Sequence, residues 1–254
     1  MKVVRTIDDV RDFLVAAHSR VGLVPTMGAL HAGHLALLAA ARRECDVVVA
    51  SIFVNPAQFG EAADLAGYPR DEREDLAVAA EAGVDLAFCP SHDEMYPPGF
   101  QTWVEVTELG AILEGAYRPG HFRGVATVCL KLFNIVRPDA VYFGQKDAQQ
   151  VEVIRRLLAD LDLQIELCVV PTVRDRDGLA LSSRNVLLSR EDRDRALALP
   201  RALATKDPRR ARAQLDGLEV DYLAVAPFDP PVLAAAVRVG GVRLIDNVPL
   251  EEER

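Results

Sequence analysis

Short apolar segments typical of β-strands alternate with longer helix-forming segments along residues 1–170, and this alternation constrains the fold more than any other feature of the chain. Strands that are joined through helices lie parallel in one sheet, and the helices cover its faces. The sequence therefore predicts a Rossmann-like α/β fold with a doubly wound, mainly parallel sheet, which binds ligands beyond the carboxyl ends of its strands. The predicted strands are residues 2–4, 21–24, 47–53, 86–89, 103–106, 140–143 and 165–170, and the predicted helices are residues 7–18, 35–44, 70–82, 124–136 and 148–161.

The pattern changes after Pro171. A charged helix is predicted at residues 190–204, followed by a break at Lys-Asp-Pro-Arg-Arg (206–210) and by three strands at residues 220–225, 232–239 and 242–246. Gly240-Gly241 joins the last two strands and is a hairpin signal. The sequence thus predicts two domains, a larger one over residues 1–172 and a smaller α+β domain over residues 173–254.

Composition limits the class of protein. Half of the residues are apolar, but no apolar run approaches the roughly 18 residues that a membrane span requires, so we expect a soluble protein without a membrane partner. The N-terminus shows no export signal, which favours a cytoplasmic location. The net charge of −9 argues against a broad nucleic-acid surface. Cys45, Cys89, Cys129 and Cys168 show no metal or redox spacing and are expected to be reduced core residues.

The segment PTMGALHAGH (25–34) places two imidazoles around a glycine at the start of a helix, directly after a strand. Backbone N–H groups and the positive end of the helix dipole face such a turn, which is therefore suited to phosphate. His31 and His34 are three residues apart, so both can reach one bound group. Gly28 and Gly33 allow a nucleotide to approach the backbone closely. Taken alone, the histidines would also fit a helix cap with purely local hydrogen bonds.

Two carboxamides follow the next strand in the segment SIFVNPAQF (51–59). An amide both donates and accepts hydrogen bonds, so Asn55 and Gln58 suit the hydroxyl and the carboxylate of one small substrate. The structural alternative is an Asx turn at Asn55-Pro56, which explains Asn55 better than Gln58.

A lysine stands at the centre of the third motif, VYFGQKDAQQ (141–150). Arginine outnumbers lysine 25 to 4 in this chain, so Lys146 runs against the prevailing bias and indicates a need for a compact ammonium group. Such a point charge suits phosphate, and Asp147 can bind a ribose hydroxyl. A surface Lys-Asp pair at a helix start remains the alternative.

The fourth motif is PTVRDRDGLALSSRN (171–185), which follows the last strand of the predicted sheet. The two hydroxyls and the guanidinium of Ser182, Ser183 and Arg184 can clamp a polyphosphate. By itself, this segment also fits an ordinary polar loop.

Two weaker features remain. Glu74 and Asp75, on the acidic helix predicted at residues 70–82, could hold a magnesium ion, although a solvated helix face explains them as well. Arg118 and His121 lie in a glycine-containing loop, whose residue types suggest a lid or a subunit contact.

Six segments carry a family resemblance: PTMGALHAGH, SIFVNPAQF, YPRDEREDL, EGAYRPGHFRGVATV, KLFNIVRPDAVYFGQKDAQQ and PTVRDRDGLALSSRN. In this order they closely resemble the pantoate–β-alanine ligase (pantothenate synthetase) family of the HxGH nucleotidyltransferase superfamily. The resemblance covers about residues 1–190. A lone HxGH would also fit class I aminoacyl-tRNA synthetases or other nucleotidyltransferases, but GQKDAQQ together with LSSRN points to this ligase family.

The resemblance implies a reaction in which ATP activates the carboxylate of (R)-pantoate as an enzyme-bound pantoyl adenylate, with release of pyrophosphate. The amine of β-alanine would then displace AMP to form pantothenate (vitamin B5), which leads to coenzyme A. Magnesium would share the phosphate charge, and closure of the C-terminal domain or of the Ser-Ser-Arg loop would protect the adenylate. The resemblance also implies a homodimer. The chain departs from the family in its second domain, which is short between about residues 204 and 220.

Residue roles implied by the resemblance fall into three groups. ATP would contact Met27, Gly28, Ala29, Leu30, His31, Ala32, Gly33, His34, Gly144, Gln145, Lys146, Asp147, Val173, Leu181, Ser182, Ser183 and Arg184. The catalytic residues would be His34, as the proton donor to the leaving phosphate, with His31, Lys146, Ser182, Ser183 and Arg184. Pantoate would contact Gln58, Gln150, Asn55 and Met27, and Gln58 would also lie near β-alanine.

Two other hypotheses stay open at this point. A nucleotidyltransferase acting on a phosphorylated substrate predicts more basic residues in the acceptor pocket than Asn55, Gln58 and Gln150 provide. A nucleotide-binding regulator or inactive relative is expected to have lost a catalytic position, yet the HxGH histidines, Lys146 and Arg184 are all present.

Overall fold

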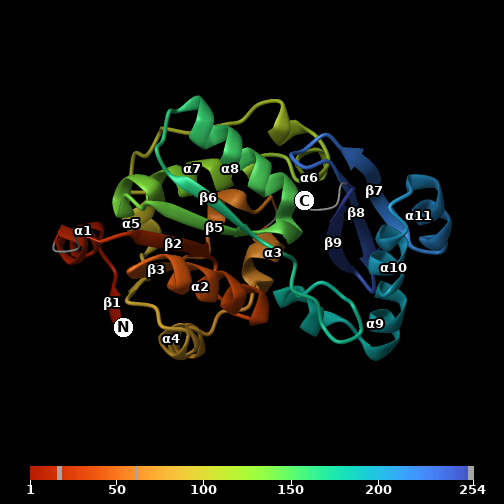
Figure 1. Ribbon diagram of the computed structural model, residues 1–254, viewed down its shortest axis with the longest axis horizontal. Coiled ribbons are helices and arrows are strands. Elements are labelled where there is room, and N and C mark those ends of the chain that lie inside the picture. Colours follow the sequence, from red (N-terminus) through yellow and green to blue (C-terminus); the bar gives the residue numbers. More distant parts are fainter. Residues whose placement is uncertain (16–18, 61, 251–254) are drawn as a thin grey trace. The chain divides into compact units, whose positions relative to one another are not determined.

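The computed structural model describes residues 1–15, 19–60 and 62–250 (Figure 1). The chain divides into two compact units, the first made of residues 1–143 and 153–170 and the second of residues 144–152 and those from 171 onward. The second unit thus begins two residues before the predicted boundary and also includes the segment 144–152, which the sequence assigned to the first domain. The last three residues of the helix predicted at 7–18 and the last four of the predicted second domain lie outside the described residues.

The first unit contains a six-stranded sheet in the order β1-β4-β3-β2-β5-β6. The registers of β1 with β4, β4 with β3, β3 with β2 and β2 with β5 are all parallel, as predicted. The strands are β1 (Lys2–Val4), β2 (Val21–Thr26), β3 (Val47–Ile52), β4 (Leu86–Phe88), β5 (Ala140–Gly144) and β6 (Glu166–Val170).

The strand order reverses at β2. From β2 the chain continues to β3 on one side, whereas β5 lies on the other side, with Gly22 opposite Ala140 and Leu23 opposite Val141. In doubly wound sheets, ligands as a rule bind at the carboxyl ends of the two strands on either side of such a reversal. The HxGH turn (residues 27–34) directly follows β2, and the Gly-Gln-Lys-Asp segment (residues 144–147) begins at the last residue of β5.

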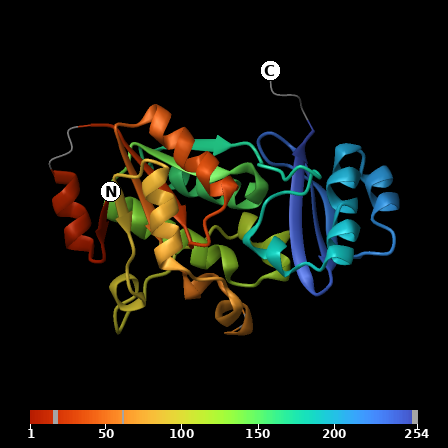
Figure 2. The same cartoon turned by 90° about the horizontal axis from the view of Figure 1, so that it is seen from below.

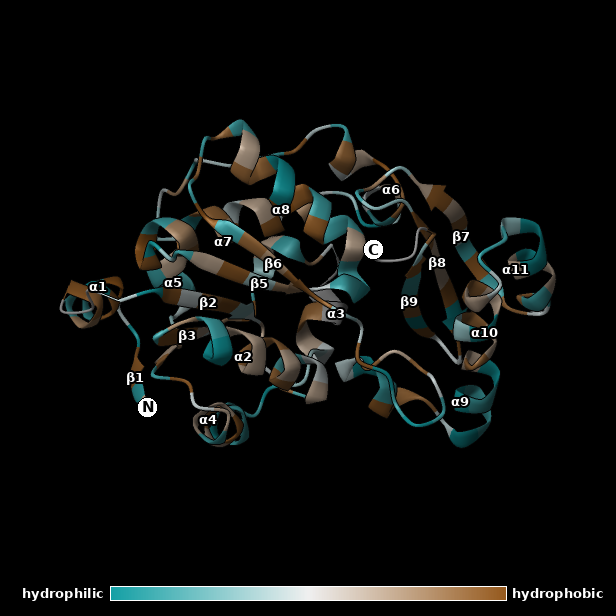
Figure 3. Ribbon diagram, viewed as in Figure 1, coloured by the Kyte–Doolittle hydropathy of each residue, from teal (hydrophilic) through white to brown (hydrophobic). Residues whose placement is uncertain are grey.

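Helices cover both faces of this sheet. On one face of the sheet, α2 and the end of α4 pack on the strands. On the other face, α7 packs on β2 (Figures 1 and 2). The central strands are mainly apolar, as a sheet buried on both faces requires (Figure 3). The helices are α1 (Ile7–Val15), α2 (Ala32–Glu44), η1 (Pro56–Gln58), α3 (Ala62–Gly67), α4 (Glu72–Glu81), α5 (His92–Met95), η2 (Leu109–Ala111), α6 (Glu114–Tyr117), α7 (His121–Val136), η3 (Gln145–Asp147) and α8 (Ala148–Asp160), where η denotes a 3₁₀ helix; η3 and the start of α8 belong to the second unit.

The prediction of a strand at residues 103–106 is wrong. These residues, all within the described part of the chain, form an irregular segment in which Val104 N donates a hydrogen bond to Thr127 Oγ1 at 3.0 Å. Val104 and Val106 pack against a buried cluster made of Phe122 and Ala126 of α7 with Val153 of α8. The alternation of apolar residues therefore reflects packing on a helix and not pairing with another strand.

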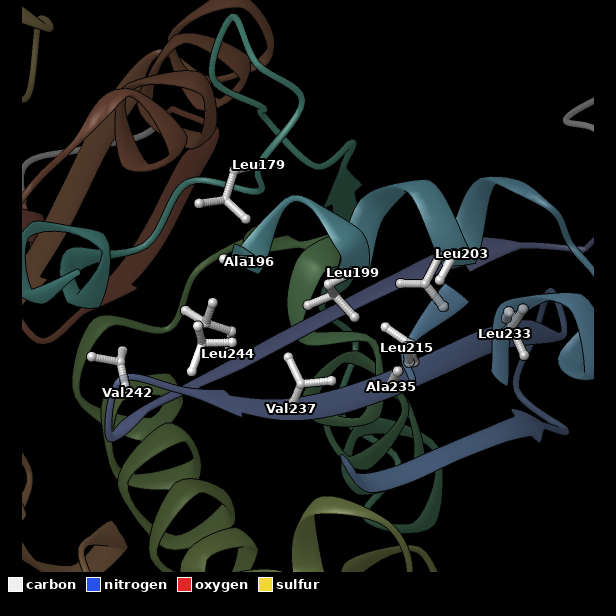
Figure 4. Close-up of a cluster of buried hydrophobic side chains, with 13 residues drawn as sticks. Leu179, Ala196, Leu199, Leu203, Leu215, Leu233, Ala235, Val237, Val242 and Leu244 are labelled. Carbon is white, nitrogen blue, oxygen red and sulfur yellow. The ribbon is translucent and has the colours of Figure 1, made fainter. Parts of the chain in front are cut away.

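The second unit has a three-stranded antiparallel sheet in the order β7-β8-β9, with α10 packed on β8 and β9. Leucine, valine and alanine side chains fill the space between the sheet and its helices (Figure 4). Gly240 and Gly241 both have positive φ angles, of +57° and +78°, as a two-residue hairpin turn between β8 and β9 requires. The elements are η4 (Ser183–Leu187), α9 (Arg190–Ala196), α10 (Ala198–Ala204), α11 (Pro208–Gln214), β7 (Glu219–Ala226), β8 (Val232–Val239) and β9 (Val242–Pro249).

Two predictions for the helices of this unit need correction. The helix predicted at 190–204 is divided at Leu197, because Pro200 lacks the N–H that would bond to the carbonyl of Ala196. The break predicted at 206–210 is shorter than expected. Asp207 caps α11 by accepting hydrogen bonds from Arg209 N and Arg210 N at 2.8 and 2.9 Å, and Pro208 begins the helix.

The cysteines occupy the interior, as predicted, with Cys45, Cys89 and Cys129 buried and Cys168 half-buried. Burial raises the pKa of Cys89 and Cys168 to about 11 and that of Cys129 to about 12. These three thiols therefore remain protonated and unreactive at neutral pH. Within the described residues, no helix combines the length and apolar character needed to cross a bilayer.

Gly124 generates a prediction about how the first unit is held together. A Cβ at this position of α7 would lie 2.4 Å from the carbonyl oxygen of Ala57 in η1, so Gly124→Ala must push the two elements apart. We expect a loss of about 1–3 kcal/mol in the free energy of unfolding, measured by urea denaturation. Gly67→Ala is the control, because a Cβ added there would have no atom within 4 Å. Equal stability of the two variants would contradict this packing.

Candidate active site

One buried carboxylate shapes the turn that follows β2. Asp75, in the first turn of α4, is 4% exposed. Its Oδ2 accepts a hydrogen bond from Ala29 N at 3.0 Å, and its Oδ1 accepts one from Leu30 N at 2.7 Å. The carboxylate therefore fixes the path of the backbone between β2 and α2.

Gly28 is required by the same arrangement. Its φ of +80° lies in the left-handed region, which side chains disfavour. A Cβ at this position would also lie 2.6 Å from Oδ2 of Asp75. A larger residue would displace the carboxylate, so Gly28 serves the shape of the turn itself.

The two histidines of the HxGH turn cap the start of α2. His31 is the N-cap, and its Nδ1 accepts a hydrogen bond from Gly33 N at 3.1 Å. In return, His34 Nδ1 accepts one from His31 N at 3.2 Å, and the ring centroids are 4.2 Å apart. Because each Nδ1 accepts, the neutral form of each ring carries its proton on Nε2. The turn thus has two imidazole donors at a helix N-terminus, where an anion is stabilised.

Gly33 is needed because His31 folds back over it. A Cβ on Gly33 would lie 2.8 Å from His31 Cε1. The helix cap that the sequence suggested as an alternative to phosphate binding is therefore present. Its two hydrogen bonds, His31 Nδ1 with Gly33 N and His34 Nδ1 with His31 N, also orient the imidazole rings. The cap and a phosphate site are compatible, because the cap uses Nδ1 of each ring.

The residues predicted to hold magnesium do not fit that ion. Both oxygens of Asp75 bond to backbone N–H groups, and its neighbour Glu74 is exposed. Among the residues that the structure describes, no three His, Cys, Asp or Glu side chains gather as a metal site. The structure instead gives Asp75 the role of holding the HxGH turn.

The two carboxamides after β3 contact each other and Met27. Asn55 Nδ2 donates to Gln58 Oε1 at 3.0 Å, and Gln58 Nε2 donates to Met27 Sδ at 2.9 Å. The first unit therefore brings together three of the residues predicted to bind substrate. The Asx turn is also present, since Asn55 Oδ1 accepts from Ala57 N at 3.3 Å.

Arg118 and His121, whose role the sequence left open, hold the main chain of Gln58. Arg118 Nη1 lies 3.2 Å from His121 Nε2. A guanidinium only donates, so Nε2 accepts and Nδ1 of the neutral ring carries the proton. That Nδ1 donates to the carbonyl oxygen of Gln58 at 2.8 Å. This loop therefore supports the Gln58 segment of its own unit.

In the second unit, Asn247 of β9 organises the Gly-Gln-Lys-Asp segment. Its Nδ2 donates to the carbonyl oxygens of Gln145 and Lys146 at 2.8 and 2.9 Å. Its Oδ1 accepts from Gln145 Nε2 at 3.1 Å. Asn247 is 3% exposed, so these hydrogen bonds are shielded from water and fix the backbone that carries Lys146.

The adjacent Asp246 holds the loop that leads to Ser182, Ser183 and Arg184. Arg174 donates to both of its carboxylate oxygens, at 2.6 and 3.0 Å, and Asp246 is 2% exposed. Leu181 N donates to the carbonyl oxygen of Val173 at 3.0 Å, which closes the base of the loop.

Ser182 begins η4 beyond that base. Its Oγ accepts a hydrogen bond from Arg184 N at 3.2 Å. The sequence did not predict the roles of Asp246 and Asn247, although two adjacent polar residues between the apolar residues 244–245 and 248–250 were the available signal.

The predicted site residues divide between the units. The first unit holds residues 27–34, with Asn55, Gln58, Glu74 and Asp75. The second unit holds Gly144, Gln145, Lys146, Asp147, Gln150, Val173, Leu181, Ser182, Ser183 and Arg184. In each unit, a buried side chain fixes the backbone of a turn that carries predicted residues. Asp75 holds Ala29 and Leu30, and Asn247 holds Gln145 and Lys146, which gives the rigidity that an anion site needs.

Comparison with known proteins identifies the family. Residues 2–249 match the family model described as pantoate-beta-alanine ligase. A pantothenate synthetase from Chloroflexus aurantiacus is 51% identical over 280 residues, covering 100% of this chain and 99% of that protein. One from Corynebacterium glutamicum is 51% identical over 92% of this chain and 94% of its own length.

Solved structures agree with this identification. The pantothenate synthetase of Thermus thermophilus is 46% identical and has a TM-score of 0.94, covering 99% of this chain and 100% of its own. The pantoate-beta-alanine ligase of Francisella tularensis, solved in complex with beta-gamma ATP and beta-alanine, is 36% identical with a TM-score of 0.89, covering 100% and 99%. Identity of this extent over nearly the whole chain, together with the HxGH turn, shows that the protein belongs to the pantoate–β-alanine ligase family of enzymes.

Proposed function

We propose that the protein condenses (R)-pantoate with β-alanine in an ATP-dependent reaction that yields pantothenate, AMP and pyrophosphate through an enzyme-bound pantoyl adenylate. This product would serve coenzyme A biosynthesis. The observation that carries the proposal is the HxGH turn, in which two imidazole Nε2 donors stand at the N-terminus of α2 on a backbone fixed by Asp75. The complex of the Francisella tularensis relative with beta-gamma ATP and beta-alanine supports two of the substrates.

In the first step, a carboxylate oxygen of pantoate attacks the α-phosphorus of ATP. A new oxygen–phosphorus bond forms, and the bond between the α-phosphorus and the bridging oxygen breaks, releasing pyrophosphate. No side chain becomes a covalent nucleophile, so the protein has to position anions and stabilise the charge that develops on phosphate. His34 would donate its Nε2 proton to the leaving phosphate, with His31 beside it.

The second unit would supply further positive charge and backbone contacts to ATP. Lys146 would neutralise the phosphates, and Ser182, Ser183 and Arg184 would bind them from their loop. This role agrees with how firmly Asn247 and Asp246 hold these two segments.

In the second step, the amine of β-alanine attacks the acyl carbon of the adenylate. A carbon–nitrogen bond forms, the carbon–oxygen bond to phosphate breaks, and AMP leaves with that oxygen. Gln58 and Gln150 would hold pantoate during both steps, and Gln58 would also lie near β-alanine. We further propose that the protein is cytoplasmic and, as the family resemblance implies, a homodimer. Sedimentation of the purified protein tests the dimer.

Two assays test the reaction. Purified protein should form AMP from ATP only when both pantoate and β-alanine are present. It should also exchange labelled pyrophosphate into ATP with pantoate alone, because adenylate formation is reversible. Absence of AMP with both substrates present would refute the ligase, and exchange that requires β-alanine would refute the adenylate.

The HxGH turn predicts a specific loss of activity. His34→Ala should lower kcat for AMP formation and the rate of pyrophosphate exchange by about 100-fold or more, because a donor to developing phosphate charge is removed. Asp207→Ala, which removes the side-chain cap of α11, provides the control and should retain activity. Circular dichroism of both variants would check that α2 survives loss of the cap. A His34→Ala enzyme with unchanged kcat would contradict the proposed role.

The second unit predicts an effect on ATP binding. Asn247→Ala removes the two hydrogen bonds that hold the carbonyls of Gln145 and Lys146. We expect the KM for ATP to rise about tenfold, because the backbone that carries Lys146 loses its support. The exposed Asn134 of α7 provides the matched control through Asn134→Ala. An unchanged KM for ATP in a folded Asn247→Ala protein would show that β9 does not position the segment.

A further inference from the structure

Asn55 has no hydrogen-bonding capacity left for a substrate. Its two Nδ2 hydrogens are used on Gln58 Oε1 at 3.0 Å and on the carbonyl oxygen of Gly124 at 3.1 Å. Its Oδ1 accepts from Ala57 N at 3.3 Å and from Tyr96 Oη at 3.0 Å. The residue is 1% exposed. A carboxamide has two donors and two acceptor sites, and all four are occupied.

Backbone groups decide which way this amide faces. A carbonyl oxygen only accepts, so Gly124 requires Nδ2 of Asn55 on its side, and Ala57 N only donates, so it requires Oδ1. Asn55 therefore presents N–H to Gln58. Gln58 must accept this hydrogen bond with its Oε1, so its Nε2 points away from Asn55.

The Nε2 of Gln58 consequently faces Met27, where it lies 2.9 Å from the thioether sulfur. A thioether is a weak acceptor, so this contact is exchanged at little cost for an anionic or hydroxyl oxygen. Gln58 therefore offers its N–H donors to a ligand. It does so because its Oε1 is already occupied by Asn55.

Tyr96 completes this arrangement. The residue is 7% exposed, and its ring packs against Phe53, Phe100 and Trp103, with centroid distances of 6.3, 5.1 and 5.9 Å. Burial raises the pKa of the hydroxyl above its ordinary value, so it remains a donor over the working pH range. Its hydrogen bond is the shorter of the two that Asn55 Oδ1 accepts.

We propose that Asn55 and Tyr96 are positioning residues that direct the Gln58 carboxamide, so that Gln58 offers only N–H donors to the carboxylate or hydroxyl oxygens of pantoate. This inference rests on the proposed role of Gln58 in holding pantoate. It also reassigns Asn55, which the sequence predicted to bind substrate directly, as a residue that acts through Gln58.

A double-mutant cycle tests the proposal. The variants are Tyr96→Phe, Asn55→Ala and the double variant, with kcat and the KM values for pantoate and ATP measured for each. Tyr96→Phe removes only a hydroxyl from the aromatic cluster, so we expect the KM for pantoate to rise about fivefold, and Asn55→Ala should raise it about 50-fold. The double variant should match Asn55→Ala, because Tyr96 acts through Asn55. The KM for ATP should change less than about twofold in all three.

Tyr142→Phe is the matched control. Tyr142 is also buried in the first unit, and its hydroxyl donates to Glu44 Oε2 at 2.9 Å, at the end of α2 opposite the HxGH turn. Its loss should leave the KM for pantoate unchanged. If Asn55→Ala cannot be purified as a folded protein, the KM for pantoate of Tyr96→Phe, compared with that of Tyr142→Phe, tests the proposal by itself.

Three outcomes overturn the proposal. They are an unchanged KM for pantoate in Tyr96→Phe or Asn55→Ala, a double variant in which the two effects multiply, and an equal rise in the KM values for pantoate and ATP. Wild-type protein that shows no pantoate-dependent activity would instead refute the proposed function, so the two failures are distinguishable.

Discussion

The carboxylate of Asp75 between two backbone N–H groups is the contact on which the HxGH turn depends. The chain leaves β2 through left-handed backbone at Gly28 and Ala29, with φ angles of +80° and +50°, and such a path is stable only when its amides are satisfied. Asp75 satisfies two of them. Because the turn is fixed there, α2 begins at Ala32, and the imidazoles of His31 and His34 stand at the positive end of its dipole.

The second unit uses the same principle on other residues. Asn247 holds backbone carbonyls of the segment after β5, and Asp246 holds Arg174 at the base of the Ser-Ser-Arg loop. Both side chains come from consecutive residues of one strand, so a single element fixes two segments with predicted phosphate contacts. Buried polar side chains that are fully satisfied are rigid, and rigidity limits the reorganisation that binding a triphosphate would require.

Much of this arrangement was accessible to sequence reasoning. The strand and helix alternation predicted β2, β3, β4 and β5 because their apolar residues must be buried on both faces of a parallel sheet, and it also predicted the partly buried edge strand β6. It failed at residues 103–106, where apolar residues pack on α7 instead of pairing in a sheet. The HxGH histidines were predicted from their spacing, whereas the hydrogen bonds that orient them came only with the structure.

The amino-acid sequence by itself determined the strands of both sheets, the longer helices of the first unit, the family and the residue types at the turns, because local periodicity and contiguous motifs carry that information. Only the tertiary structure decided what each polar residue does. Asp75 lies on α4, whereas the turn it holds precedes α2, and Tyr96 lies 41 residues along the chain from Asn55. Hydrogen bonds between such distant residues leave no local pattern. An exposed acid, a magnesium ligand and a buried acceptor of backbone N–H groups therefore look alike in sequence until folding places their partners.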